Sequence, residues 1–212
     1  MSNALVQRVD HLVYAAPALE TALGVLEARL GVRATPGGQH LGRGTRNALI
    51  ALGPRSYLEV IGPDPNQPAP STRRWFGVDA LTQPRLVAWA VASTQIDEIV
   101  ARAARSGVVL GRILDGGRQR PDGTALRWRV TDPTIVLADG LIPFFMDWLS
   151  SPHPAADAAR GCTLTDLRAE HPTPDEVRRV LALFDLDLDL REGAHPALVA
   201  TLESPRGRVE LR

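Results

Sequence analysis

Residues 6–16 read VQRVDHLVYAA and residues 18–30 read ALETALGVLEARL. The first run alternates with the two-residue period of a β-strand, which places His11 on the same face as the apolar residues Val9, Val13 and Ala15. The second run carries apolar residues at helical spacing and ends before Gly31, because glycine is a common residue just after a helix. A strand followed by a helix is therefore predicted at the start of the chain.

The next elements extend this pair into a module. Residues 37–44 are rich in glycine and predict a loop, after which residues 46–52 and 56–61 predict two strands joined at Gly53 and Pro54. If residues 32–35 begin a further strand, the order of elements is βαβββ. The same order returns with a strand at 85–92, a helix at 96–106, and strands near 110–113, 124–130 and 141–148.

A third unit is indicated by an internal similarity. The segment ALIALGPRSYLEV at 48–60 resembles ALVATLESPRGRVEL at 197–211, and both end in a strand with glutamate between apolar residues. A strand at 162–169 and a helix at 175–184 precede the second of these segments. We therefore expect three βαβββ units with two linkers: 1–64 first module, 65–84 crossover linker, 85–149 second module, 150–160 linker, and 161–212 third module-like unit.

Composition argues against several classes of partner. Lys plus Arg and Asp plus Glu each number 24, so no net positive charge favours binding to nucleic acid. No apolar run approaches the ~20 residues that cross a bilayer, and residues 1–10 lack the pattern of a signal peptide. Cys162 is the single cysteine and cannot form an internal disulfide. We expect a cytoplasmic protein with a small-molecule ligand, no nucleic-acid partner and no membrane partner.

Several longer motifs carry a family resemblance. They are DHLVYAAP at 10–17, GGQHLGRGTRNALIALG at 37–53, YLEVIGPDP at 57–65, WFGVD at 75–79, RPDG at 120–123, LRWRVTD at 126–132 and GLIPFFMDW at 140–148. With them, nearly the whole chain resembles bacterial members of the vicinal oxygen chelate superfamily, and within it the glyoxalase-like domain family. The resemblance implies an α+β fold in which βαβββ modules pair into a half-open barrel, as in glyoxalase- and dioxygenase-type folds.

The resemblance also implies a place for a divalent metal ion. In metal-dependent members, the first and fourth strands of a module each give one ligand, and these positions are His11 and Glu59 in the first module. In the second module Ala88 or Trp89 falls opposite His11 and cannot bind a metal, whereas Asp147 falls opposite Glu59. The expected metal ligands are thus His11, Glu59 and Asp147, for an ion that is Zn, Mn, Fe or Ni without distinction. Two alternatives stay open: His40 joins from the glycine-rich loop, or modules one and three pair and add Asp166 and Glu210.

Each of these residues also has a structural interpretation. His11 on an apolar face is consistent with a hydrogen-bonded core histidine, Glu59 with a solvent-facing side chain, and Asp147 with an ion pair to Arg127 or Arg129. Thr45 and Asn47 are expected to hydrogen-bond their own loop. The residues expected to contact a substrate are His40, Trp89, Trp128 and Phe145, with Trp89 projecting into the barrel.

Two function hypotheses follow. The first is a divalent-metal-dependent enzyme with lyase, isomerase or dioxygenase-type chemistry on a bidentate oxygen substrate, in which Glu59 also serves as catalytic proton acceptor. The second is a metal-free binding protein that sequesters a small apolar or aromatic compound. An unpaired third unit would expose an apolar sheet face, so a homodimer is a further expectation.

Overall fold

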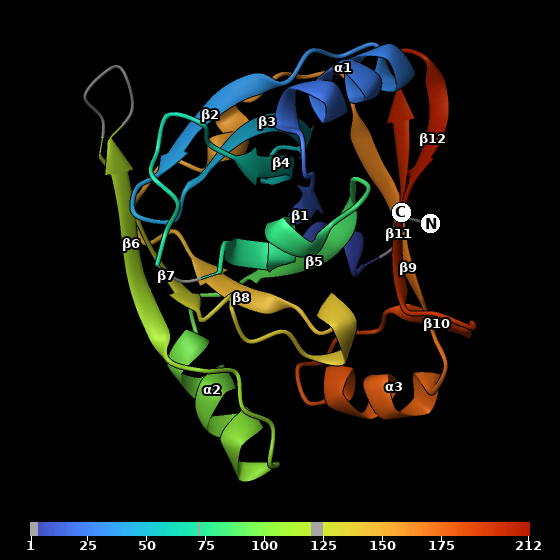
Figure 1. Cartoon of the computed structure of the whole chain (residues 1–212). Helices are drawn as coiled ribbons and strands as arrows, with labels where there is room; N and C mark the ends of the chain where they lie inside the picture. Colours follow the sequence, from blue (N-terminus) through green and yellow to red (C-terminus); the bar gives the residue numbers. More distant parts are fainter. Residues whose placement is uncertain (1–3, 72, 120–124) are drawn as a thin grey trace.

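The computed structural model describes residues 4–71, 73–119 and 125–212, so the RPDG motif lies outside the described residues. The strands form two sheets (Figure 1). The larger has eight strands in the order β2-β3-β4-β1-β5-β8-β7-β6, and the smaller has four in the order β10-β9-β11-β12. The larger sheet curls, and its two edge strands both lie on the side away from the smaller sheet. The fold class expected from the sequence, a half-open barrel of α and β elements, is confirmed.

Two modules with the same internal order build the large sheet. The first comprises β1 (Val9–Ala15), α1 (Leu19–Leu30), β2 (Thr35–His40), β3 (Thr45–Gly53) and β4 (Ser56–Pro63). The second comprises β5 (Arg85–Ala92), α2 (Ile96–Arg105), β6 (Ile113–Gln119), β7 (Ala125–Thr131) and β8 (Phe144–Asp147). In each module the first and fourth strands pair in parallel, and β1 pairs antiparallel with β5 to join the modules.

The first helix forms as its sequence pattern predicts. Its buried residues recur every three or four positions and turn one face to the sheet; they are Leu19, Ala22, Leu26 and Leu30. Gly31 ends the helix in the left-handed conformation with φ 72°, and its N–H donates to the carbonyl of Glu27. The described chain also contains four 3-10 helices: η1 (Val6–Arg8), η2 (Trp75–Ala80), η3 (Ala138–Gly140) and η4 (Pro154–Ala156).

The glycine-rich stretch differs from the expectation, because much of it is strand rather than loop. β2 contains Gly37 and Gly38 and ends at His40, so that His40 stands on the sheet. A Cβ atom on Gly37 would lie 2.2 Å from Oδ1 of Asn47, on the neighbouring strand β3. Glycine is therefore required for this close approach rather than for a turn.

The third unit has the expected order of elements but a different arrangement. It comprises β9 (Thr163–His171), α3 (Pro174–Ala182), β10 (Asp189–Glu192), β11 (Ala197–Ser204) and β12 (Gly207–Leu211). Here the first strand lies between the second and the third, whereas β1 lies next to β4. The pairing of modules one and three does not occur, since β1 pairs with β5. Glu210 instead forms an ion pair with Arg168 on the small sheet, at 2.9 Å.

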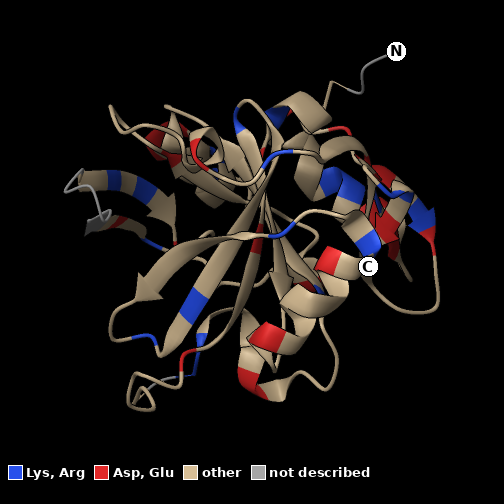
Figure 2. Cartoon of the chain, turned by 90° about the horizontal axis from the view of Figure 1, so that it is seen from above, with Lys and Arg blue, Asp and Glu red and all other residues tan. Residues whose placement is uncertain are grey.

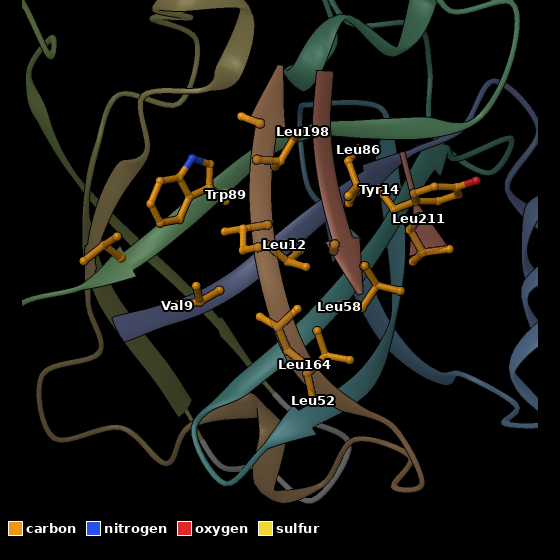
Figure 3. Packing of buried hydrophobic residues seen from close by; sticks show 14 of the residues in the cluster. Val9, Leu12, Tyr14, Leu52, Leu58, Leu86, Trp89, Leu164, Leu198 and Leu211 are labelled. Atoms are coloured by element: carbon orange, nitrogen blue, oxygen red, sulfur yellow. The ribbon is translucent and has the colours of Figure 1, made fainter. Parts of the chain in front are cut away.

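One apolar cluster fills the space between the two sheets (Figure 3). Leu12, Leu58 and Trp89 come from the large sheet and meet Leu164 and Leu198 from the small one. The same cluster includes the buried residues of α1 and α2, so this side of the large sheet is called the outer face. The third unit thus buries its apolar face within the chain. The argument for a homodimer loses its basis, and the dimer stays an untested prediction.

The surface carries both signs of charge. Basic and acidic residues are interspersed along the ribbon, including the strands of the small sheet near the C-terminus (Figure 2). Arg168 bonds Glu170 at 3.1 Å and Glu210 at 2.9 Å, and Arg212 bonds Glu170 at 3.0 Å. These contacts form a small ion-pair network on the small sheet.

The structure also describes the surroundings of the single cysteine and the lengths of the helices. Cys162 is buried, and burial raises the pKa of its thiol, as for an unreactive cysteine. Within the described ranges, the helices are all too short or too polar to cross a membrane.

Candidate functional site

Three titratable side chains meet on the inner face of the large sheet, the face opposite the helices. They are His11 from β1, Glu59 from β4 and His40 from β2. Nε2 of His11 lies 3.8 Å from Oε2 of Glu59, and Nε2 of His40 lies 3.7 Å from Oε1 of the same carboxylate. The curl of the first module therefore places one carboxylate between two imidazoles, although the three residues are far apart in sequence.

Glu59 is buried rather than solvent-facing, with 7% of its surface exposed. Its neighbours along β4 explain this, because Tyr57 and Ile61 share its face and belong to the apolar cluster of the inner side. Burying a carboxylate requires hydrogen bonds. Nδ2 of Asn47, on β3, donates to Oε1 of Glu59 at 2.5 Å.

Asn47 was not expected in the site. The sequence-based interpretation placed it in a self-bonded loop, whereas β3 directs it towards Glu59. Its two-residue spacing from Leu49 and Ala51, which line the inner face, is the signal that would have identified it. Thr45 contacts Nδ1 of His40 through Oγ1 at 2.9 Å, which is a contact within the glycine-rich stretch, as expected.

His11 is oriented by Asp10, the residue before it. Oδ1 of Asp10 lies 2.7 Å from Nδ1 of His11. Consecutive residues of a regular strand point to opposite faces, but the register of β1 against β5 shifts between Val9 and His11. Val9 consequently joins the outer cluster, contrary to the simple alternation expected, while Asp10 and His11 reach one another.

Asp10 is fully buried and receives further hydrogen bonds from the end of the second module. Nε1 of Trp148 donates to its Oδ2 at 2.9 Å, and Nε2 of His153 lies 3.2 Å from the same oxygen. Burial raises the pKa of Asp10, but the hydrogen bonds from His11 and His153 outweigh burial and hold this pKa well below its ordinary value. An ionised carboxylate only accepts hydrogen bonds, so Nδ1 of His11 donates to Asp10, and Nε2 of His11 lies on the side of Glu59.

Aromatic rings enclose the two histidines. The ring of Tyr57 stacks on His11 with centroids 4.7 Å apart, and Phe144 meets His11 edge-on at 5.2 Å. Trp75, in η2, lies 5.3 Å from the ring of His40. Two buried polar atoms next to these groups, Oδ1 of Asn47 and Nε1 of Trp75, have no hydrogen-bond partner within the described chain. A polar ligand would satisfy them.

Several residues expected in the site lie elsewhere. Phe144 and Met146 of β8 face the inner cluster, so Asp147 points to the other side, where it pairs in register with Arg129 and accepts from the N–H of Leu149. The expected ligand set of His11, Glu59 and Asp147 is therefore not brought together.

The aromatic residues that were expected to contact a substrate also lie on different faces of the large sheet. Trp89 is fully buried in the outer cluster, where its Nε1 donates to the carbonyl of Leu141 at 2.9 Å, so it does not project into the barrel. Phe145 lies on the same outer side against Phe184. Trp128 alone of the three strand aromatics packs against the inner cluster, next to Trp148.

The side chains of the site are of types that bind metal ions, but they are not positioned to hold one. Two imidazoles and a carboxylate are common ligands of borderline divalent ions. Among the residues that the structure describes, however, no group of three or more His, Cys, Asp or Glu side chains is placed so that it could hold a metal ion.

The paired βαβββ modules, the first of which carries a buried His and Glu on its first and fourth strands, define a protein of the vicinal oxygen chelate superfamily. The glyoxalase-like domain family matches residues 9–184 of the chain, and the protein belongs to this family. None of the curated proteins compared with the sequence matches it significantly.

Solved structures share the fold at low sequence identity. A hypothetical protein from Staphylococcus aureus is 14% identical with a TM-score of 0.59, and the alignment covers 95% of this chain and 83% of that one. Methylmalonyl-CoA epimerase from Mycobacterium tuberculosis is 19% identical with a TM-score of 0.43, covering 74% of this chain and 96% of that one. The likeness to the Staphylococcus aureus protein extends to the fold alone.

Proposed function

We propose that the protein is a small-molecule enzyme that moves a proton at a carbon next to a carbonyl group, with Glu59 as proton acceptor. One observation carries this proposal: the Glu59 carboxylate is buried on the inner face between His11 and His40 and is held by Asn47. A positioned carboxylate in a partly dry site is a typical general base. The chemistry belongs to the isomerase and lyase types expected from the sequence.

The two oxygens of Glu59 have different surroundings. Oε1 accepts the hydrogen bond from Asn47, whereas Oε2 faces Nε2 of His11. In the proposed step the C–H bond next to the carbonyl breaks, the proton passes to Oε2 of Glu59, and the electron pair moves onto the carbonyl oxygen as an enolate. Return of the proton to the same face of that carbon regenerates the substrate, whereas transfer of a proton from solvent to the opposite face, with the proton on Glu59 released to water, inverts the carbon and completes an epimerisation.

We also propose, as a separate point, that a divalent ion assists this reaction. His11 and Glu59 would hold it with His40 as the third ligand, in place of Asp147. When bound, the ion would supply a Lewis acid that polarises the carbonyl oxygen of the substrate. The side chains would have to move to close around it, so the proton transfer above is assigned to protein groups alone.

Deuterium exchange tests the role of Glu59. Hydroxyacetone and dihydroxyacetone, which carry exchangeable C–H bonds next to a carbonyl, are incubated with the protein in D2O and followed by proton NMR. We expect the Glu59→Gln variant to lose at least ~100-fold of the exchange rate that the wild type shows, as for removal of a general base. Asp147→Asn is the matched control and should retain the wild-type rate, since Asp147 points away from the inner face. Equal rates in wild type and Glu59→Gln would contradict the proposal.

Elemental analysis of protein purified without chelator tests the metal. Near-stoichiometric metal that is lost in His11→Ala, His40→Ala and Glu59→Ala but kept in Asp147→Ala would support the ligand set. A metal-free wild type that resists reconstitution would contradict metal dependence. Combined with an absence of deuterium exchange, it would favour the alternative of a binding protein, for which an apolar cavity beside the site is the favouring observation.

A further inference from the structure

A cavity of about 200 Å³ lies at the strands of the second module, and one of its lining residues, Phe144, contacts His11. Its walls include the apolar residues Phe76, Val87, Ala88, Ile142 and Phe144, together with the charged residues Arg85 and Asp139. Ala88 pairs in register with Val13, which lies two residues from His11 on the inner face of β1. The cavity therefore opens on the same side of the sheet as the buried carboxylate.

Two aromatic rings form a wall that the cavity shares with the site. Phe144 lines the cavity and also meets the ring of His11, with centroids 5.2 Å apart. Phe76 lines it as well and lies 6.0 Å from Phe144, while its neighbour Trp75 contacts His40 at 5.3 Å. Phe144 is therefore a wall common to the cavity and to His11.

The backbone around the cavity is held in unusual conformations. Phe76 and Asp139 have φ values of 57° and 55°, in a region that residues other than glycine seldom adopt. Gly140 follows Asp139 and approaches the backbone of β5. Its φ is 90°, and a Cβ atom at this position would lie 1.9 Å from the carbonyl oxygen of Val87. Strained segments of this kind persist where the surrounding structure fixes them, often at ligand sites.

We propose that this cavity holds the apolar group of the substrate, and that the substrate is a carbonyl compound bearing an aromatic ring or a branched alkyl group of similar size. The proposal rests on the proposed function, because it takes the reacting carbonyl to lie at Glu59. Size supports it: an engineered apolar cavity of about 150 Å³ binds benzene, so one of about 200 Å³ holds a six-membered ring.

Binding of phenylglyoxylate, compared with glyoxylate, tests this assignment by calorimetry. The two anions share one head group and differ by the ring, and phenylglyoxylate has no hydrogen on the carbon next to its ketone, so it reports binding without turnover. We expect the ring to tighten binding at least tenfold. Equal affinities of the two anions for the wild type would overturn the proposal.

Two variants locate the ring. Ala88→Phe places a ring in the cavity and should reduce the preference for phenylglyoxylate to less than threefold. Ala101→Phe is the matched control, because Ala101 lines a separate and larger cavity on α2, of about 410 Å³, and this variant should keep the full preference. A preference that survives Ala88→Phe, or falls equally in Ala101→Phe, would contradict the assignment.

A third variant covers the case in which Ala88→Phe does not fold. Ile142→Ala enlarges the cavity and should improve the affinity for 2-naphthylglyoxylate relative to phenylglyoxylate at least threefold; an unchanged ratio would count against the cavity. Deuterium exchange by the wild type separates the two proposals. A ring preference that persists while the wild type shows no deuterium exchange would overturn the proton-transfer function and leave the cavity assignment standing.

Discussion

Oδ1 of Asp10 lies 2.7 Å from Nδ1 of His11, the next residue in β1. This contact depends on the shift in register between Val9 and His11, because a regular strand would point the two side chains to opposite faces. The irregularity of one strand thus fixes the orientation of the imidazole and aims its Nε2 at Glu59. Asp10 also ties the site to the segment after β8 through Trp148 and His153.

Removal of the Asp10 carboxylate should destabilise the protein strongly. Asp10→Ala leaves the buried donors of His11, Trp148 and His153 without an acceptor, which we expect to cost about 2–4 kcal/mol in the free energy of unfolding. Urea denaturation measures this change. Asp147→Ala, which removes one acceptor from a half-buried turn, should cost less than about 1 kcal/mol. Similar losses in the two variants would show that the Asp10 network contributes little.

Gly37→Ala should disturb the site without a change of charge. The new Cβ atom would lie 2.2 Å from Oδ1 of Asn47, so that Asn47 must move away from Glu59. The side-chain amide signals of Asn47 in a proton–nitrogen NMR spectrum should shift, and deuterium exchange should slow by about tenfold or more. Gly24→Ala is the control, since its Cβ atom meets nothing within 4 Å. In α1 it should stabilise the protein by about 0.5–1 kcal/mol. Unchanged Asn47 signals in Gly37→Ala would refute the expected displacement.

Trp89→Phe should affect stability and leave the site intact. The variant removes the indole hydrogen bond to the carbonyl of Leu141 and opens a void in the cluster between the sheets, with an expected cost of about 1–3 kcal/mol. Its rate of deuterium exchange should equal that of the wild type, because Trp89 lies on the outer face. Trp128→Phe, at a half-buried position of the inner side, should cost less in the same denaturation experiment. A stable Trp89→Phe variant with altered exchange would contradict this placement.

The ion pairs of the small sheet should make stability depend on pH below neutrality. The hydrogen bond from Arg212 lowers the pKa of Glu170, and the hydrogen bond from Arg168 lowers the pKa of Glu210. A carboxylate whose pKa is lower in the folded state stabilises the fold above its unfolded pKa, and this stabilisation is lost as the pH falls through the folded value. The melting temperature should therefore drop between about pH 5 and pH 3.

Arg168→Gln provides the comparison for this pH effect. Without the guanidinium, the pKa values of Glu170 and Glu210 should move towards their ordinary values, so the melting temperature should depend less steeply on pH over the same range. Arg55→Gln, which removes a cation from an exposed turn, should keep the wild-type slope. Parallel curves for wild type and Arg168→Gln would exclude these pairs as the source of the effect.

The sequence by itself determined most elements of the fold and indicated two residues of the candidate site. Alternation in residues 9–15, the helical stripe ended by Gly31, and the family motifs are local patterns, and each can be read because strand and helix periods depend on near neighbours. His11 and Glu59 followed from the same motifs.

Only the tertiary structure decided how these pieces combine. Pairing register and sheet curl decide that β1 pairs with β5. They also bring His40 and Asn47 close to Glu59 and place Asp147 and Trp89 on the outer face. A shift of one residue in register moves a side chain to the other face, and such shifts arise from contacts between distant segments. For that reason Asp10, one residue from the expected ligand His11, could be assigned its role only from the folded chain.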